Sequence, residues 1–152
     1  MESTDPFLAW ALKDAGFGSG KTEEVPWAAL DCASNAGIVS TTGVCELLFP
    51  RLVTYRSGVF RQARFTAENV DQWFEQPGID VTRVEAVVNH IHLAQDQFPD
   101  TTDEQFPLIE RLAETLSETW PWWAEHRYGF RIQVRVERYA DDIQITLVSN
   151  NE

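Results

Sequence analysis

Two segments of this 152-residue chain combine residue types that could do chemistry. The first, residues 15–22, matches a relaxed phosphate-binding loop in which alanine replaces the first glycine. Such a loop cradles phosphate only where it follows a strand and opens a helix. Here the residues before it have a helical pattern, Glu23 and Glu24 would repel phosphate, and Pro26 interrupts the following turns. We therefore interpret the segment as a flexible Gly/Ser loop rather than a nucleotide site.

The second segment contains the histidine pair His90 and His92. On a helix, residues two positions apart lie about 200° around the axis, so these rings could share a metal ion only if the helix broke there. No Glu or Cys stands at a partner spacing. We expect boundary histidines that hydrogen-bond to neighbouring elements, and the sequence predicts no metal site and no cofactor.

The two cysteines, Cys32 and Cys45, belong to no paired metal or redox motif. Free cysteine is among the most buried residue types, so both are expected to be small core side chains. A disulfide bridge between them stays open. No serine–histidine–aspartate set or other catalytic group can be identified, and we expect a protein that is not an enzyme.

The charge distribution is the unusual property of the sequence. Twelve basic against 24 acidic residues give a net charge of −12, which disfavours nucleic acid as a partner and favours a basic protein. Residues 66–119 carry twelve acidic side chains against only Arg83 and Arg111, a net of −10. Seven of the twelve basic residues fall in the expected strand regions. The helical part is therefore predicted to be acidic and the sheet more basic.

Two candidate surfaces follow from this segregation. Glutamates recur every four residues near residue 114, and such uncompensated repulsion along a helix is typical either of a solvated face or of a surface kept for a partner. A tryptophan cluster follows at 120–123, where indoles either fill a core seam or form a binding hot spot. The predicted partner-binding residues are Asp103, Glu104, Glu110, Glu114, Glu118, Trp122 and Trp123, with Arg131 and Arg135 as a secondary surface.

The C-terminal region must position these side chains. Residues 130–148 alternate apolar and polar side chains around one polar turn, which predicts an antiparallel hairpin with one solvated face. Both apolar sets share a face only if Val136 lies opposite Ile145 and Val134 opposite Leu147, with residues 140–141 at the tip. A second hairpin is expected at about 52–65, with a two-residue turn at 57–58.

Helical periodicity occupies most of the remaining chain. We expect helices at about 5–15, 67–76, 81–95 and 106–120, with Thr66 and Asp80 as N-caps and Pro121 ending the last one. Residues 27–36 suit a short helix that ends at Gly37, 42–48 a further one, and 38–42 look β-like. The predicted fold is a single α+β domain, 1–152, with both hairpins in one antiparallel sheet covered on one face by helices.

Size, acidity and the lack of catalytic motifs favour a protein-binding module that neutralises or docks a basic partner. Immunity proteins and antitoxins that block a basic toxin have this character. Two alternatives remain open: a small enzyme or ligand-binding domain with a pocket between sheet and helices, and a structural or self-associating domain such as a homodimer. No apolar segment is long enough to cross a membrane and no signal pattern is present, so we expect a cytoplasmic location.

Overall fold

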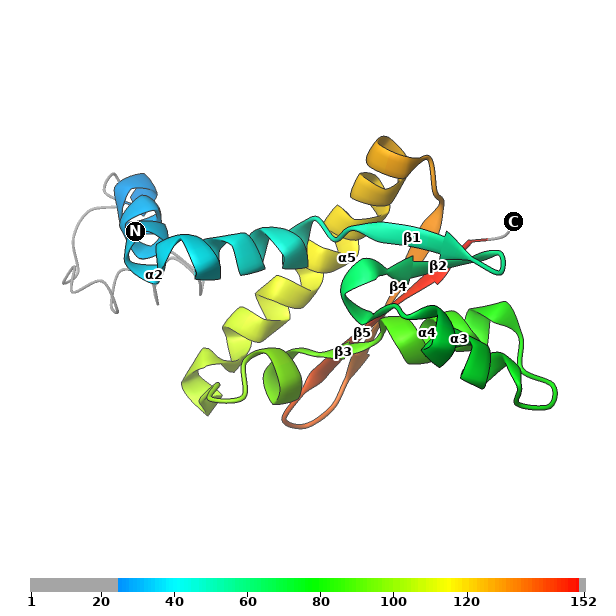
Figure 1. Cartoon of the computed structure of the whole chain (residues 1–152). Coiled ribbons are helices and arrows are strands. Elements are labelled where there is room, and N and C mark those ends of the chain that lie inside the picture. The colour runs from blue at the N-terminus through cyan, green and yellow to red at the C-terminus, as the bar shows by residue number, and fades with distance from the viewer. Residues whose placement is uncertain (1–24, 151–152) are drawn as a thin grey trace.

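The structure, a computed structural model, describes residues 25–150 and the side chains of residues 37–150 (Figure 1). Its elements follow in the order α2 (Val25–Leu48), β1 (Leu52–Tyr55), β2 (Gly58–Arg61), α3 (Ala67–Phe74), α4 (Val81–Asn89), β3 (Ile91–His92), α5 (Phe106–Tyr128), β4 (Ile132–Arg138) and β5 (Ile143–Ser149). The α+β class is therefore confirmed. The predicted helix at 5–15 and the loop at 15–22 lie outside the described residues.

The C-terminal hairpin has the register that the alternation predicted. Val136 pairs with Ile145 and Val134 with Leu147. The turn at its tip is closed by a 2.8 Å hydrogen bond from Tyr139 N–H to the Asp142 carbonyl. The apolar side chains of β5 pack against α5 and are fully buried. The register follows from the sequence because a one-residue slip would expose every apolar side chain of this face.

The expectation of one solvated face holds for β4 but is wrong for β5. Strand β5 lies in the centre of a three-stranded sheet of order β3-β5-β4. Strand β5 contacts β2 and α4 in addition to α5. Its second face is therefore also covered, and Thr146 and Val148 are buried. Helices therefore do not cover only one face. On β4 the alternate residues Gln133 and Arg135 are exposed, as predicted.

The first hairpin turns one residue earlier than predicted. Tyr55 pairs with Gly58, so the two turn residues are Arg56 and Ser57, both with positive φ (47° and 65°). This geometry matches the type I′ turn that suits the twist of a hairpin. Glycine is required at 58 for space rather than for its φ angle, because a Cβ there would lie 2.8 Å from the Phe60 ring.

The two hairpins form separate sheets instead of the single sheet that we predicted. Helix α4 joins them through two fully buried polar side chains. The Glu85 carboxylate accepts hydrogen bonds from Val59 N–H (2.7 Å) and from Ser149 N–H (3.0 Å). The Asn89 amide accepts from Arg61 N–H (2.9 Å) and donates to the carbonyls of Val59 (2.8 Å) and Leu147 (3.0 Å). Side chains of a helix thus satisfy backbone groups of β2 and β5 that a neighbouring strand would otherwise satisfy.

Helix α4 is shorter than the predicted 81–95 element. It begins at the predicted cap, where the Asp80 carboxylate accepts from Arg83 N–H at 2.8 Å, but ends at Asn89. His90 has extended backbone angles and Ile91 pairs with Ile145 of β5, so sheet pairing overrides the helical pattern. A short turn at Leu93–Gln97 follows. Helix α3 is close to the predicted 67–76 and has the predicted cap from Thr66.

The long helices also depart from prediction at one point each. Helix α5 continues through Pro121 and ends at Gly129, which has a left-handed conformation (φ 72°). Two indoles hold the chain on either side of the proline, since Trp120 Nε1–H donates to the Leu47 carbonyl (2.8 Å) and Trp123 Nε1–H to that of Pro50 (3.0 Å). Helix α2 is bent at Gly37, the predicted end of the 27–36 segment, and residues 38–42 are helical rather than β-like.

Candidate functional site

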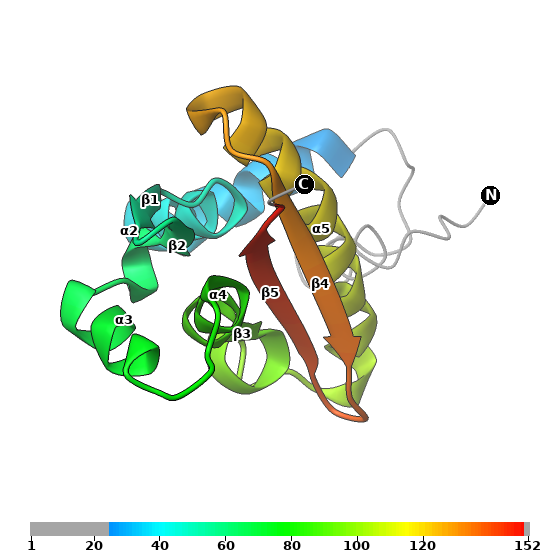
Figure 2. The same ribbon diagram turned by 90° about the vertical axis from the view of Figure 1, so that its right-hand side faces the viewer.

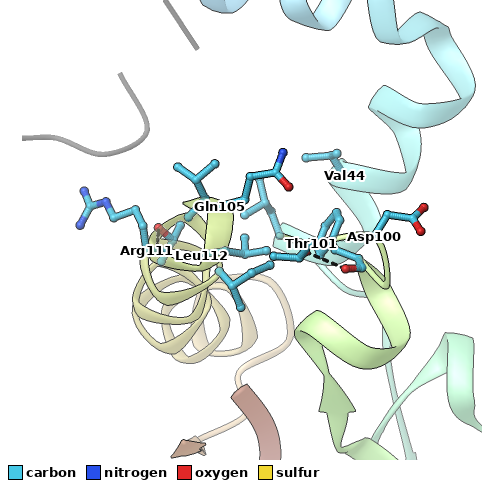
Figure 3. A pocket seen from close by; sticks show the side chains of 11 residues that line it. Val44, Asp100, Thr101, Gln105, Arg111 and Leu112 are labelled. Atoms are coloured by element: carbon cyan, nitrogen blue, oxygen red, sulfur yellow. Dashed lines mark hydrogen bonds between the residues drawn. The ribbon is translucent and has the colours of Figure 1, made fainter. Parts of the chain in front are cut away.

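An apolar groove of about 760 Å³ lies between the second half of α2, residues 98–105 and the first half of α5 (Figure 3). Its apolar side chains are Val44, Leu48, Phe98, Leu108, Ile109 and Leu112. Polar side chains at its border are Asp100, Thr101, Gln105, Arg111 and Thr115. Val44 and Phe98 remain 50% and 40% exposed, so apolar surface is open to solvent at this site. The volume falls within the range of specific binding pockets.

Local hydrogen bonds fix the wall of the groove that residues 98–105 form. The Phe98 carbonyl accepts from both the N–H (3.0 Å) and the hydroxyl (2.6 Å) of Thr101. The Gln105 side chain accepts from Thr102 N–H at 3.1 Å, which caps the short helical turn Asp103–Gln105 that leads into α5. These contacts hold the Phe98 side chain at the groove.

The charge of this wall is uniformly negative. Residues 95–110 contain five carboxylates and no basic side chain. Asp100 lines the groove, and the predicted residues Asp103 and Glu104 lie exposed beside it. Carboxylates at this position also stabilise the N-terminus of α5 through its dipole. Arg111, on the other wall, lies 3.4 Å from Glu114, so its charge is already offset within the protein.

The structure leaves the predicted glutamate stripe along one side of α5, since residues four positions apart lie only about 40° apart around the helix axis. Glu110, Glu114 and Glu118 are all exposed. Glu110 and Glu114 each lie two residues from Leu112, which places them about 200° around the helix axis, away from the groove. Glu118 lies about 60° around the axis from Thr115, so it is the member of the stripe nearest to the groove. Within the described part of the chain, no ion pair involves Glu110 or Glu118.

The three tryptophans of the cluster have three different environments. Trp120 is fully buried, and Trp123 is half-buried with Phe49 against its edge at 5.3 Å between ring centroids. Only Trp122 is mainly exposed, at 56%, and it stacks on His126 at 5.1 Å. Trp122 lies seven residues after Thr115, so it continues the groove side of α5 towards the C-terminus. Trp120 is a core residue, whereas Trp122 remains available for a partner.

Acidic side chains elsewhere serve internal roles. Asp71 pairs with Arg56 at 2.8 Å and accepts from the Tyr55 hydroxyl. Glu85 is the buried bridge described above. The acidic surplus of residues 66–119 is thus partly structural, and the carboxylates that remain on the surface are concentrated on residues 96–118. The basic residues Arg131, just before β4, and Arg135, on β4, are both exposed.

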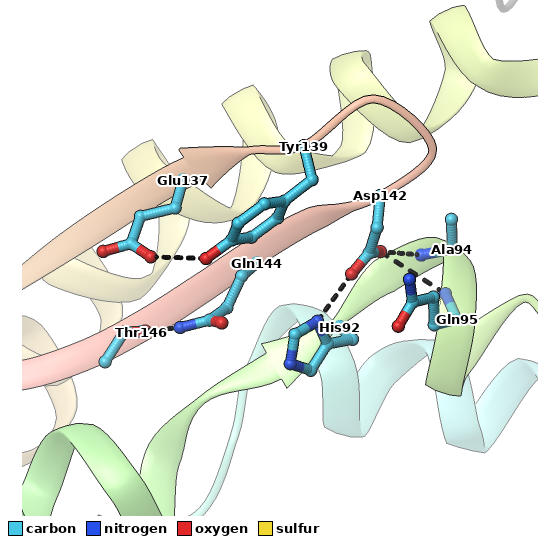
Figure 4. A network of polar contacts seen from close by, with 8 residues as sticks. All are labelled: His92, Ala94, Gln95, Glu137, Tyr139, Asp142, Gln144 and Thr146. Carbon is cyan, nitrogen blue, oxygen red and sulfur yellow. Dashed lines mark hydrogen bonds and ion pairs between the residues drawn. The ribbon is translucent and has the colours of Figure 1, made fainter.

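His92 belongs to a polar network near the tip of the C-terminal hairpin (Figure 4). His92 Nδ1 contacts the buried Asp142 carboxylate, which also accepts from the N–H groups of Ala94 and Gln95. Burial raises the pKa of Asp142, but the hydrogen bonds from His92 and from the backbone outweigh it and lower the pKa below its ordinary value. His90 Nδ1 lies 2.7 Å from the Val87 carbonyl. His92 therefore contacts a neighbouring element, as the sequence suggested, whereas His90 contacts the last turn of α4, the helix that it caps.

Sequence reasoning missed a buried cation. Arg61 lies with its guanidinium 5.0 Å from the Trp120 ring, and its Nε and Nη1 atoms have no hydrogen-bond partner in the described part of the chain. Burial and the nearby Arg64 lower the pKa of Arg61 to about 10. The alternation of β2 does not predict the burial of Arg61, because an arginine at the end of a strand is expected to be solvated. Glu85 and Asn89 carried a better signal, since they fall within the apolar spacing of α4.

Several other predictions can be compared with the structure. Cys45 is an exposed free thiol, so the expectation of a buried side chain is wrong there, and the side chain of Cys32 lies outside the described residues. Among the described residues, no three potential metal ligands come together. None of the described helices combines the length and apolar character needed to span a membrane.

A scan against protein-family models, a search of curated proteins and a search of solved structures each found no match to this chain.

Proposed function

We propose that this protein binds a basic protein partner through the groove between α2 and α5, as immunity proteins and antitoxins bind basic toxins. The observation that supports the proposal most strongly is the combination at one site of an open apolar floor and a wall without basic side chains. Apolar side chains of a partner would fill the groove, and lysine or arginine side chains beside them would face Asp100 and Asp103. An amphipathic basic helix has this distribution of side chains.

The electrostatic contribution is expected to act mainly on association. A net charge of −12 attracts a basic protein over distance, whereas the apolar contacts hold the complex once it has formed. Trp122 and Glu118 extend the same side of α5 and would enlarge the contact. Arg111 is already paired with Glu114, so it does not oppose a basic partner as a free cation would.

The test uses a synthetic amphipathic helical peptide with leucines on one face and lysines on the other. A second peptide carries glutamates in place of the lysines. Fluorescence anisotropy should show that the basic peptide binds, that added salt weakens it, and that the acidic peptide does not bind. Equal affinity for the two peptides would contradict the electrostatic part of the proposal.

Matched variants locate the binding surface. Val44→Lys places a positive charge in the groove, whereas Ile38→Lys makes the same charge change on the same helix at a residue that is 79% exposed and does not line the groove. Val44→Lys should lower the affinity for the basic peptide by about tenfold or more, and Ile38→Lys should leave that affinity within about twofold of the wild-type value. Equal losses of affinity in the two variants would show that the groove is not part of the binding site.

The groove supports a second candidate, a small apolar ligand, because its volume of about 760 Å³ is large enough to enclose one. An uncharged apolar dye distinguishes the two. If the dye binds in a manner that Val44→Lys abolishes while neither peptide binds, the groove is a ligand pocket and the partner proposal fails. When the basic peptide binds, a pull-down from cell lysate at low and high salt then identifies the natural partner.

A further inference from the structure

Strand β4 forms a free edge of the three-stranded sheet. The sheet order β3-β5-β4 leaves one side of β4 without a described strand, and Figure 2 shows this edge on the side of β5 away from α3 and α4. Pairing with β5 runs without a bulge from Ile132 to Arg138, and the strand contains no proline, glycine or lysine. Bulges and prolines are among the means by which proteins protect edge strands from pairing, and β4 has neither. A regular seven-residue edge without them is suited to bind another strand.

The hydrogen bonds show which backbone groups of β4 point to this free edge. Asn150 N–H of the chain after β5 donates to the Arg131 carbonyl at 2.9 Å, so residue 131 turns towards β5. On β5, the Leu147 carbonyl and the Ser149 N–H are bonded to α4, so odd-numbered residues of β5 turn away from β4. Because these directions alternate along antiparallel strands, the odd-numbered residues of β4 pair with β5. The N–H and C=O groups of Ile132, Val134 and Val136 therefore point outward.

The side chains of β4 are complementary to a second β4 strand. An antiparallel pair of two copies centred on Val134 places Arg131 of each copy opposite Glu137 of the other, and Gln133 opposite Arg135. On the other face it places Ile132 opposite Val136. Both copies then present outward-pointing backbone groups at residues 132, 134 and 136, so the hydrogen-bond pattern closes symmetrically.

Neighbouring registers lack this complementarity. Centring the pair on Arg135 would place the two Arg135 side chains directly opposite each other, and centring it on Gln133 would place Arg131 opposite Arg135. Like charges directly opposite across antiparallel strands are destabilising. Of these three registers, the one centred on Val134 is therefore the one that charge favours.

The burial of β4 agrees with a missing neighbour. Val134 and Val136 are only half-buried, although their cross-strand partners on β5, Leu147 and Ile145, are fully buried. Helix α5 covers these valines on one side, and a second copy would bring its own Val134, Val136 and Ile132 beside them. An axis perpendicular to the sheet would place both α5 helices on the same face of a continuous six-stranded sheet.

We propose that the protein forms a symmetric dimer in which two β4 strands pair in antiparallel orientation about Val134. This interface is separate from the groove between α2 and α5 and does not depend on the proposed function. Each copy has a net charge of −12, and each paired strand carries a local surplus of two positive charges from Arg131, Arg135 and Arg138 against Glu137, so charge opposes approach and the dimer depends on the Arg131–Glu137 pairs, the backbone hydrogen bonds and the apolar face. At moderate ionic strength the overall repulsion is screened beyond about 8 Å.

The experiment is sedimentation velocity of the full chain over a range of concentrations at moderate salt. We expect a concentration-dependent monomer–dimer equilibrium. Val134→Pro removes an outward-pointing N–H without removing a hydrogen bond to β5, so it should leave a folded monomer. Far-UV circular dichroism and the urea midpoint, measured where the wild type is monomeric, check that fold. A monomeric wild type at every concentration would overturn the proposal.

Charge reversal tests the register independently of the proline variant. Arg131→Glu and Glu137→Arg should each weaken the dimer by about tenfold or more, because each replaces two attractive pairs by two like-charged ones. The double variant Arg131→Glu/Glu137→Arg restores opposite charges and should recover the wild-type dissociation constant. Single variants that dimerise like the wild type, or a double variant that stays monomeric, would show that this register is wrong.

Discussion

Replacement of Asn89 by alanine tests the central structural conclusion, that side chains of α4 join the two sheets. The Asn89 side chain is fully buried and makes three hydrogen bonds, to Arg61 N–H and to the carbonyls of Val59 and Leu147, at 2.8–3.0 Å. Alanine removes all three and leaves the backbone groups buried. No nearby strand can replace them, because β2 and β5 belong to different sheets.

The expected loss follows from the cost of unpaired buried groups. Each costs about 1–3 kcal/mol, so three together cost about 3–9 kcal/mol. Water entering the space left by the amide would bring the loss towards the lower end, and we expect about 3–5 kcal/mol in the free energy of unfolding. For a chain of this size, 1 kcal/mol lowers the Tm by about 2–4 °C, so the Tm should fall by about 6–20 °C.

Urea denaturation followed by circular dichroism and tryptophan fluorescence measures this loss. Asn69→Ala is the matched control, because Asn69 is exposed on α3, and it should change stability by no more than about 0.5 kcal/mol. Amide hydrogen exchange adds a local readout, since Arg61 N–H should lose protection. If Asn89→Ala cost less than about 1 kcal/mol, the bridging hydrogen bonds would not hold the sheets together and the reasoning would be refuted.

Two further predictions concern buried charges. The pKa of Asp142 is lowered from its ordinary value of 3.8, so its carboxylate stabilises the fold above the unfolded pKa and this contribution is lost as pH falls through the folded pKa. The urea midpoint of the wild type should exceed that of Asp142→Asn at neutral pH, with a difference that shrinks below about pH 4; a constant difference would contradict this assignment. For Arg61→Met, we expect stability equal to or greater than that of the wild type, because the variant removes a buried guanidinium in which two nitrogen atoms, Nε and Nη1, have no hydrogen-bond partner in the described part of the chain. A loss above about 2 kcal/mol in urea denaturation would instead show that the contact with Trp120 outweighs the desolvation.

Prediction of the local elements succeeded where one residue pattern had one physical solution. The alternation of β4 and β5 allowed only the observed register, because any other would expose the apolar face. The caps at Thr66 and Asp80 could be predicted because a side-chain oxygen at a helix start satisfies backbone N–H groups of its own turn. These interactions join residues close in sequence.

Prediction of the candidate site was only partial. The acidic residues and Trp122 were found from charge and composition, but not the groove beside them. The groove needs α2 and α5, whose facing residues Val44 and Leu112 are 68 positions apart, and the sequence contains no signal of their proximity. Likewise the position of the glutamate stripe relative to the groove could not be predicted, because only the tertiary structure shows which side of α5 packs in the core and which side borders the groove.

The sequence by itself determined the α+β class, the hairpin register and the acidic character of the helical region, because each depends on short-range periodicity or on composition. The tertiary structure alone decided that α4 ends at Asn89, that α5 continues through Pro121, and that the sheets are joined by side chains. In each case contacts between distant segments outweighed the local preference: pairing of Ile91 with β5, the indole bonds to the end of α2, and the buried amide of Asn89. Local propensities amount to about 1 kcal/mol or less per residue, apart from proline, and buried hydrogen bonds and packing exceed them.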